Sequence, residues 1–417
     1  MECYDVLVIG GGPAGLAAAL SAKENGASTL IVEREAHPGG ILKQCIHDGF
    51  GLIQFKEKLS GPEYAERFIK MVKEADIKIL TSTFVIKVEE AENKFVVTLV
   101  NSESAVFQIS SKTLVLANGC RERTSKQIFI NGTRPAGILT AGTAQFFVNI
   151  AGYLPCKKCI ILGSGDIGLI MARRLKLEGA EVLGVYEAKP SPSGLTRNIV
   201  QCLNDYSIPL YLSKTITRVF GTDRIEAAEI VSLDENMNPI KGTEETIKCD
   251  GIILSVGLIP ENEISEALEI ALDSSTKGPY VDENFMTLKE GVFSCGNVLH
   301  VNDLVDYVSE SGKLAGANAA KYSKDNLSRE LIPIKAPKDD FLYVVPQFIN
   351  KTADGEVVIY FRSKDIRENT SVTIKCGSKI LYNKNYLKIK PPEMERIKLD
   401  LSGVDLKNEQ FIELIMA

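Results

Sequence analysis

The chain of 417 residues has no low-complexity tract and no stripe of basic residues. Proteins that bind nucleic acid usually gather positive charge on one face, whereas the formal net charge here is −6. Nucleic acid is therefore not an expected partner. With 45% hydrophobic and 24% charged residues, the composition is that of a globular protein long enough for two or three domains.

The chain also lacks an uncharged run typical of a membrane span. Residues 6–22 are uncharged, but they fall short of the ~20 apolar residues that a span requires, and they include four glycines and a proline. No basic segment precedes the first apolar run, as it would in a signal peptide. We expect a cytoplasmic protein without a transmembrane segment.

Cysteine and histidine are scattered along the chain. The nine cysteines show no spacing typical of a disulfide framework, and most should be reduced in the cytosol. The three histidines, His37, His47 and His300, are too far apart in sequence to indicate a metal site. We therefore expect no bound metal.

A glycine motif, in contrast, occurs twice. The three glycines of each copy have the same spacing: Gly10, Gly12 and Gly15, then Gly163, Gly165 and Gly168. In such a motif the first glycine permits a tight turn, the second lets backbone N–H groups approach a pyrophosphate, and the third lets the next helix pack on the strand. The pyrophosphate then meets the positive end of the helix dipole. Two copies predict two dinucleotide-binding sites.

Each copy continues with a helix, a glycine and an acidic residue. The expected helices cover 16–25 and 167–178, and the strands that follow end in Glu33 and Glu187. A carboxylate at this position can accept hydrogen bonds from ribose hydroxyl groups. The full pattern is far more specific than a glycine motif alone.

The predicted elements give an α/β fold with two Rossmann-like domains and a small all-β domain. We expect a discontinuous first domain of residues 1–120 and 286–330, with residues 121–285, a linker and the second domain, inserted in it. Residues 331–417 should form a domain like a β-sandwich, because short strands alternate with polar turns. The more specific expectations are a helix at 61–74, separate strands at 106–109 and 113–117, a connecting segment with several glycines and prolines at 121–157, and a helix from about 303 to 322.

The two motifs, the strand ending Ala117-Asn118-Gly119 and the later Cys295-Gly296-Asn297 resemble the pyridine nucleotide–disulfide oxidoreductase superfamily. In that superfamily the first site holds FAD and the second NAD(P)H. The stretches 119–123, 132–137 and 297–306 resemble more closely the NAD-linked flavin subunits of amine, opine, proline or glycerol-3-phosphate dehydrogenase systems. The resemblance covers about residues 1–330.

The resemblance implies roles for particular residues. The residues implied to bind FAD are Gly10, Gly12, Gly15, Glu33, Gly40, Val85, Gly119, Gly296 and Asn297. Val85 is expected on the strand after the helix at 61–74, where its backbone would meet adenine. The superfamily usually has Asp in place of Asn297 and Thr in place of Asn118. The residues implied to bind NAD are Gly163, Gly165, Gly168 and Glu187.

Glu187 favours NADH over NADPH, because a carboxylate there bonds the 2′-hydroxyl and repels a 2′-phosphate. An NADPH site usually adds an arginine nearby, and the next arginine is Arg197. Lys189 is the residue that argues for NADPH.

Two groups of cysteines invite a catalytic interpretation. Cys45 follows Gly40 with His47 close by, and an imidazolium can lower a thiol pKa. The alternative is that both residues simply pack beside the cofactor. Cys156 and Cys159 form a C-x-x-C, but Cys159 lies in the strand that leads to Gly163, which favours a packing role.

His300 and three arginines remain as candidates near the flavin. His300 could face the isoalloxazine or could be a loop residue bonded to backbone. Arg121, Arg123 and Arg134 flank the linker and could bind phosphates or an anionic substrate, or could lie at the surface.

These expectations combine into an FAD-dependent oxidoreductase that transfers hydride between NADH and flavin. Its electrons would pass to or from a partner dehydrogenase or electron carrier. One alternative is a thiol or disulfide reductase that uses Cys45 or the Cys156/Cys159 pair. Another is a redox sensor that binds FAD and NADH without catalysis.

Overall fold

The computed structural model describes residues 1–325 and 329–417, which divide into two compact units. The first unit comprises Met1–Cys120 and Pro260–Ala417, and the second comprises Arg121–Ile259. The chain re-enters the first unit at Pro260 and not at residue 286, where the sequence had suggested the boundary. The reason is packing, because Leu268 and Ile270 are buried in the core of the first unit.

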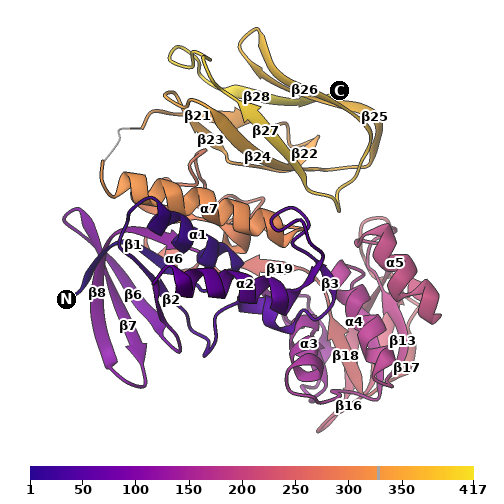
Figure 1. Cartoon of the computed structure of the whole chain (residues 1–417). Coiled ribbons are helices and arrows are strands. Elements are labelled where there is room, and N and C mark those ends of the chain that lie inside the picture. The colour runs from indigo at the N-terminus through magenta and orange to yellow at the C-terminus, as the bar shows by residue number, and fades with distance from the viewer. Residues whose placement is uncertain (326–328) are drawn as a thin grey trace. The chain divides into compact units, whose positions relative to one another are not determined.

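A seven-stranded sheet forms the centre of the first unit, with strand order β5-β2-β1-β8-β7-β6 and β20 also paired to β8 (Figure 1). The strands are β1 (Cys3–Ile9), β2 (Thr29–Val32), β5 (Lys78–Leu80), β6 (Phe84–Ala91), β7 (Lys94–Asn101), β8 (Ala105–Leu116) and β20 (Val292–Ser294). Strands β5, β2, β1, β8 and β20 are parallel, whereas β6, β7 and β8 form an antiparallel meander. The C-terminal ends of the parallel strands therefore share one edge.

Strand β8 runs continuously where the sequence predicted two strands. Residues 105–111 pair antiparallel with β7, and residues 110–116 pair parallel with β1. The strand changes partners near Ser110 and Ser111, both of which are buried. The polar residues at this point of the strand suggested a turn in the sequence, but the chain stays extended through them.

Two helices of this unit pack closely on each other, α1 (Pro13–Glu24) and α7 (Val305–Tyr322). A Cβ on Gly312 would lie 2.2 Å from the carbonyl oxygen of Ala14, and one on Gly316 would lie 2.0 Å from that of Ala18. Helix α2 (Gly61–Glu74) has the predicted bounds, and its first turn is closed by reciprocal hydrogen bonds between Ser60 and Glu63.

The second unit contains a parallel sheet of order β11-β18-β12-β13-β14 and a smaller sheet of order β10-β15-β16-β17. The parallel strands are β11 (Ile138–Thr140), β12 (Lys158–Leu162), β13 (Glu181–Tyr186), β14 (Leu210–Tyr211) and β18 (Gly251–Leu254). The smaller sheet contains β10 (Asn131–Gly132), β15 (Lys214–Gly221), β16 (Ile225–Ser232) and β17 (Glu245–Lys248). The helices are α3 (Ala141–Asn149), α4 (Asp166–Leu177) and α5 (Thr196–Cys202). Helix α3 lies in the connecting segment 121–157, where the sequence predicted no helix.

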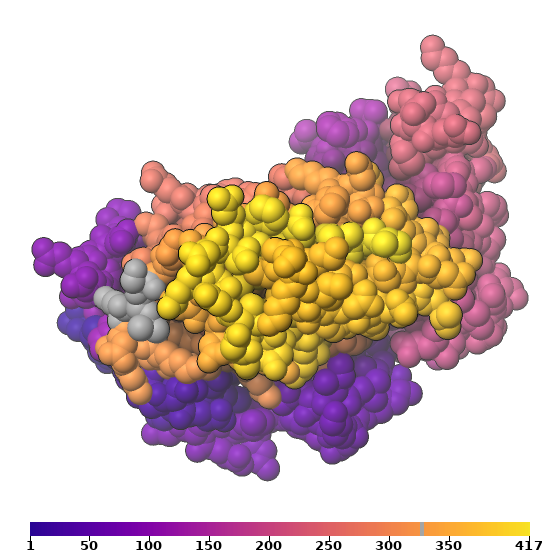
Figure 2. All heavy atoms as spheres, turned by 90° about the horizontal axis from the view of Figure 1, so that it is seen from above, coloured from indigo at the N-terminus to yellow at the C-terminus, as the bar shows by residue number. Residues whose placement is uncertain are grey.

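Residues 331–417 form two β-sheets that enclose a shared apolar core. One sheet has the order β23-β21-β28-β25-β26 and the other β22-β24-β27. The strands are β21 (Leu331–Lys335), β22 (Phe341–Val345), β23 (Phe348–Asn350), β24 (Glu356–Ser363), β25 (Arg367–Cys376), β26 (Lys379–Ile389), β27 (Glu395–Asp400) and β28 (Ile412–Met416). These sheets belong to the first unit, and Figure 1 shows them beside α7. In Figure 2 their atoms, coloured orange to yellow, form the face turned toward the viewer.

Three negative findings apply to residues 1–325 and 329–417. No helix there is both long enough and apolar enough to cross a membrane. No pair of cysteines in these ranges is joined by a disulfide. No group of three or more histidine, cysteine, aspartate or glutamate side chains in them is arranged to hold a metal ion.

Candidate functional site: two glycine turns backed by buried glutamates

The first glycine turn joins β1 to α1, and each of its glycines is required for a different reason. Gly10 has a φ of +107°, and a Cβ there would lie 2.4 Å from the carbonyl oxygen of Ala117. A Cβ on Gly15 would lie 1.8 Å from the carbonyl oxygen of Gly10. In contrast, the nearest atom to a Cβ on Gly12 is 3.9 Å away. A side chain at position 10 or 15 would therefore clash with the backbone, whereas the space beside Gly12 is open.

The second turn, between β12 and α4, repeats this geometry. Gly163 has a φ of +100°, and its Cβ would lie 2.0 Å from the carbonyl oxygen of Ser255. A Cβ on Gly168 would lie 2.5 Å from the carbonyl oxygen of Gly163. The nearest atom to a Cβ on Gly165 is 3.8 Å away. Both turns thus leave an open position beside the middle glycine.

The middle glycine of each turn is also the N-cap of the following helix. Gly12 caps α1 and Gly165 caps α4, and neither helix start receives a hydrogen bond from a capping side chain. Backbone N–H groups at such a helix start can bind an anion. The two turns differ at the next residue, which is Pro13 in the first and Asp166 in the second. The carboxylate of Asp166 accepts hydrogen bonds from the Leu195 backbone and the Asn198 side chain.

Glu33 and Glu187 support the two turns in the same way. Glu33 accepts hydrogen bonds from the backbone N–H groups of Gly11 and Glu35, both at 2.7 Å. Glu187 accepts from the backbone N–H groups of Ser164 at 3.0 Å and Lys189 at 3.1 Å. Both carboxylates are buried. Glu187 has two further donors, because the hydroxyl groups of Ser164 and Ser193 also donate to it.

The chain after Glu33 crosses the first turn at two glycines. The Gly39 N–H donates to the carbonyl oxygen of Gly11 at 2.8 Å, and a Cβ on Gly40 would lie 3.1 Å from the Cα of Gly12. The positive φ values of Gly39 and Gly40 allow this close passage.

The turn Cys295-Gly296-Asn297 lies at the start of the segment that leads to α7. Gly296 has a φ of +69°, and its Cβ would lie 2.8 Å from the Cβ of Ala14. The Asn297 side-chain oxygen accepts hydrogen bonds from the backbone and side-chain nitrogens of Asn302, at 3.1 and 3.3 Å. Buried side-chain oxygens of Asn118 and Asn302 have no hydrogen-bond partner among the described residues. Asn118 precedes Gly119 in the chain and Asn302 bonds to Asn297, and both Gly119 and Asn297 are among the residues implied to bind FAD.

Val85 and Gly119 lie at other places in the first unit. Val85 lies on β6 and pairs with Leu99. It is not on the first strand after the helix, as expected, because β5 lies between α2 and β6. Gly119 has a φ of +79°, and its Cβ would meet no atom within 4 Å. The surroundings of Gly119 are therefore open, like those of Gly12.

His300 is enclosed by aromatic rings of the C-terminal sheets. Its ring centroid lies 5.7 Å from that of Tyr343 and 5.3 Å from that of Tyr360. Neither ring nitrogen has a hydrogen-bond partner among the residues described. Burial, with a smaller contribution from the Arg362 guanidinium, lowers the pKa of His300 to about 3. The imidazole is therefore neutral at physiological pH.

Cys45 does not have the surroundings of a reactive thiol. Burial raises the pKa of Cys45 to about 12. Its sulfur donates to the carbonyl oxygen of Ile41, and the His47 ring lies against Phe50 with centroids 5.0 Å apart. The expectation that His47 could activate Cys45 is therefore not supported by the electrostatics.

Cys156 and Cys159 lie at the N-terminal end of β12, whereas Gly163 follows its C-terminal end. Both cysteines are buried in an apolar core. A hydrogen bond between the two sulfurs lowers the pKa of Cys156 and raises that of Cys159. At ~3.3 Å per residue, Cys159 and Gly163 are about 13 Å apart along the strand. The C-x-x-C pair is thus separated from the glycine turn of its own unit.

The side chains of Arg121, Arg123, Arg134 and Lys189 are exposed in the second unit.

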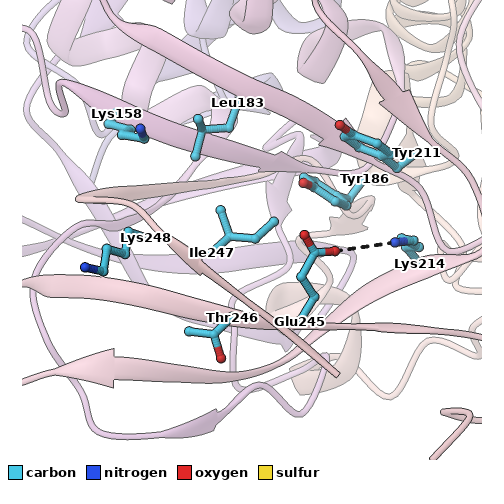
Figure 3. Close-up of a pocket in the computed structure, with 9 residues that line it drawn as sticks. All are labelled: Lys158, Leu183, Tyr186, Tyr211, Lys214, Glu245, Thr246, Ile247 and Lys248. Carbon is cyan, nitrogen blue, oxygen red and sulfur yellow. Dashed lines mark ion pairs between the residues drawn. The ribbon is translucent and has the colours of Figure 1, made fainter. Parts of the chain in front are cut away.

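A separate cavity of about 400 Å³ lies between the two sheets of that unit, lined in part by Tyr186 and Tyr211 (Figure 3). The rings of these tyrosines stack on each other at 4.7 Å. Two of its three lysines, Lys158 and Lys214, pair with Glu181 and Glu245. We assign no ligand to this cavity.

Comparison with known proteins gives the context of these turns. Residues 4–321 match the pyridine nucleotide-disulphide oxidoreductase family. Hydrogen cyanide synthase subunit HcnB of Pseudomonas protegens is 24% identical over 338 residues, covering 76% of this chain and 68% of the relative. An opine oxidase subunit of Agrobacterium tumefaciens is 25% identical over 346 residues, covering 77% of this chain and 64% of the relative. The chain thus spans about two thirds of the length of these relatives.

Among solved structures, thioredoxin reductase from T. acidophilum is similar in fold. It covers 78% of this chain and 100% of its own, with a TM-score of 0.62 and 20% identity. At this identity the similarity concerns the fold alone. The family match ends at residue 321, before the C-terminal sheets.

Proposed function

Since the chain belongs to the pyridine nucleotide-disulphide oxidoreductase family, we propose that it transfers hydride between NADH and FAD and exchanges electrons with a partner protein. As a member of this family, the chain is an oxidoreductase related to NAD(P)H-linked flavoproteins. The choice of NADH, the residue roles and the partner are the parts that we propose.

The observation that carries the proposal is the repeated glycine turn. Each turn follows a parallel strand, begins a helix, leaves an open position beside its middle glycine and is backed by a buried glutamate. This is the arrangement expected of a Rossmann-like dinucleotide site. We therefore propose two Rossmann-like sites, one for each nucleotide.

The residues of the first turn fit FAD. The open side of Gly12 and the start of α1 can receive the pyrophosphate, and Gly40 bounds the same space. Glu33 would bind the adenosine ribose, and Val85 the adenine. The unpartnered oxygens of Asn118 and Asn302 provide acceptors for donor groups of a ligand. Gly10, Gly15, Gly119, Gly296 and Asn297 complete the proposed FAD site.

The residues of the second turn fit NADH. Gly163, Gly165 and Gly168 would surround the pyrophosphate, and Glu187 would bind the ribose. A 2′-phosphate beside the buried Glu187 carboxylate would meet repulsion, whereas a 2′-hydroxyl would find an acceptor. Lys189 contributes its backbone N–H to Glu187, and its side chain is exposed.

When bound, the two cofactors supply hydride transfer between nicotinamide and flavin. The chain's own residues bind and orient the nucleotides through the glycine turns and their glutamates. No general acid or base on the chain is required for a hydride step. The catalytic contribution of the protein is therefore positioning and exclusion of water.

A partner protein is supported by two related proteins whose names describe subunits, one from a hydrogen cyanide synthase and one from an opine oxidase. We propose that this chain likewise works beside a separate dehydrogenase or electron carrier. To test this, the tagged chain would be purified from its own cells, and a protein that co-purifies with it would be assayed for NADH-linked turnover in the complex.

Anaerobic titration of the purified protein tests the core proposal. NADH should bleach the flavin absorbance with a stoichiometry of about one, and NADPH should require a much higher concentration. A protein that binds no flavin would contradict the proposal. Equal titration by the two nucleotides would contradict only the role of Glu187.

If the protein were a thiol reductase, replacing its cysteines would abolish activity, and we do not expect this result. Cys45→Ser and the double variant Cys156→Ser/Cys159→Ser should reduce an artificial dye with NADH at rates within about twofold of the wild type. The raised pKa of Cys45 and the position of the C-x-x-C pair are the reasons. A tenfold loss in either variant, with flavin content unchanged, would favour the alternative.

The sensor alternative requires that the reduced protein does not turn over. Sustained NADH consumption with an artificial acceptor would exclude it. A single, stoichiometric reduction without further consumption would support it.

A further inference from the structure

Two arginines of the C-terminal sheets bind acidic residues at and beside α7. Arg362 lies on β24 and Arg396 on the neighbouring strand β27. Arg362 binds Asp303, two residues before α7, at 2.5 Å. Arg396 binds Glu310, in the second turn of α7, through two contacts, one of them 2.7 Å long. The Tyr360 hydroxyl donates to the same Glu310 carboxylate at 2.7 Å.

The Arg362 guanidinium is fixed within its own sheets before it reaches Asp303. It donates to the carbonyl oxygens of Pro391 and Pro392, at 3.0 and 2.6 Å, and to the Tyr343 hydroxyl at 3.3 Å. Only 14% of its side chain is exposed. A planar guanidinium held by several acceptors presents its remaining N–H groups in a fixed direction.

Asp303 is held equally well, because both of its carboxylate oxygens have donors in the C-terminal sheets. One oxygen accepts from Arg362 and the other from the backbone N–H of Met394 at 2.6 Å. Val345, Val358 and Met394 also extend the core of the first unit. The sheet β22-β24-β27 and the segment before α7 therefore pack against each other.

The segment held in this way leads directly to the proposed flavin site. Asn302 precedes Asp303, and its backbone and side-chain nitrogens both donate to the Asn297 oxygen. A continuous series of contacts thus runs from Arg362 through Asp303 and Asn302 to Asn297. Of this series, Asn297 and the unpartnered side-chain oxygen of Asn302 belong to the proposed FAD site, whereas Arg362 and Asp303 do not.

We propose that Arg362 is a positioning residue for the flavin, acting through Asp303 and Asn302 on Asn297. The C-terminal sheets are then a part of the flavin site and not a detachable module. This inference rests on the proposed function, since it takes Asn297 to be an FAD contact.

The test compares FAD affinity in matched variants, measured by reconstitution of apoprotein with FAD. Arg362→Gln and Asp303→Asn should each raise the Kd for FAD at least tenfold and alter the flavin absorbance spectrum. The double variant should be little worse than either single variant, because both changes remove one contact. Arg362→Lys should recover part of the loss. The control is Arg367→Gln, because Arg367 pairs with Asp340 within the C-terminal sheets and should leave the Kd within twofold.

Three outcomes would overturn the inference. Arg362→Gln and Asp303→Asn could both bind FAD like the wild type. Arg367→Gln could weaken FAD as much as Arg362→Gln, which would indicate general destabilisation. The two single effects could add fully in the double variant. Asp303→Asn keeps Arg362 in place, so it remains informative if Arg362→Gln does not fold. Failure of the proposed function is distinguishable, since the wild type itself would then bind no FAD.

Discussion

Gly165→Ala should give a folded, yellow protein that NADH reduces poorly. The backbone of Gly165 has a φ of −65° and a ψ of 162°, which alanine adopts without strain. The new methyl group meets no protein atom closer than 3.8 Å. It occupies the space proposed for the NADH pyrophosphate, and overpacking of this kind costs about 1–3 kcal/mol. The KM for NADH should therefore rise roughly ten- to a hundredfold, measured by steady-state dye reduction.

Gly12→Ala is the matched variant in the first turn. Gly12 has a φ of −77°, and its added methyl lies 3.9 Å from the nearest atom. This variant should lose FAD affinity by a similar factor, while the thermal stability of the apoprotein stays unchanged. Gly168→Ala should instead destabilise the fold, because its methyl would lie 2.5 Å from a backbone oxygen. An unchanged KM for NADH in Gly165→Ala would show that the second turn does not bind the pyrophosphate.

The geometry of the turns could be predicted because it depends on neighbours in sequence. A glycine with positive φ, an N-cap without a side chain and an acid at the end of the next strand are all local requirements. The spacing of Gly10, Gly12 and Gly15 specified which of the three would be open. For the same reason the bounds of α2 were predicted correctly, since its apolar face and its first turn lie within one segment.

Helix α3 could not be predicted because its local signals are weak. Its nine residues include Gly142 and two adjacent phenylalanines, Phe146 and Phe147. Glycine is unfavourable in a helix interior, and aromatic residues favour strands. The burial of Ala141 and Ala144 against other elements stabilises the helix, and such packing is invisible in the segment alone.

The surroundings of His300 could not be predicted because they come from residues distant in sequence. Tyr343 and Tyr360 lie on strands 43 and 60 positions later, and Arg362 reaches Asp303 across a similar interval. Strand β21, which contains Pro333, is an interior strand of its sheet. The proline is tolerated because Pro333 pairs only with Phe348 of β23, whereas β28 pairs with Ile334 and Lys335, so Pro333 faces an unpaired side of its strand.

His300→Phe should remove a large part of the pH dependence of stability. The pKa of His300 is about 3 in the folded protein and about 6.5 in an unfolded chain. As the pH falls from 7 to 5, the unfolded state binds a proton at this residue and the folded state does not. Acidification therefore favours unfolding, by about 2 kcal/mol between pH 7 and pH 5 for this group alone. For a unit of this size, that corresponds to roughly 4–8 °C in Tm.

Calorimetry of the FAD-saturated proteins at pH 5, 6 and 7 measures this effect as the difference in Tm between wild type and His300→Phe.

Glu283 has the opposite effect on the pH dependence of stability, because burial and the neighbouring Asp282 raise its pKa to about 7. The folded state takes up this proton first, so Glu283 stabilises the protein as the pH falls from 7 toward 4.5. Glu283→Gln should therefore steepen the acid loss of Tm, whereas His300→Phe should flatten it. If Tm fell equally with pH in the wild type and in His300→Phe, the His300 imidazole would be accessible to water. The C-terminal sheets would then not shield the segment before α7 from solvent.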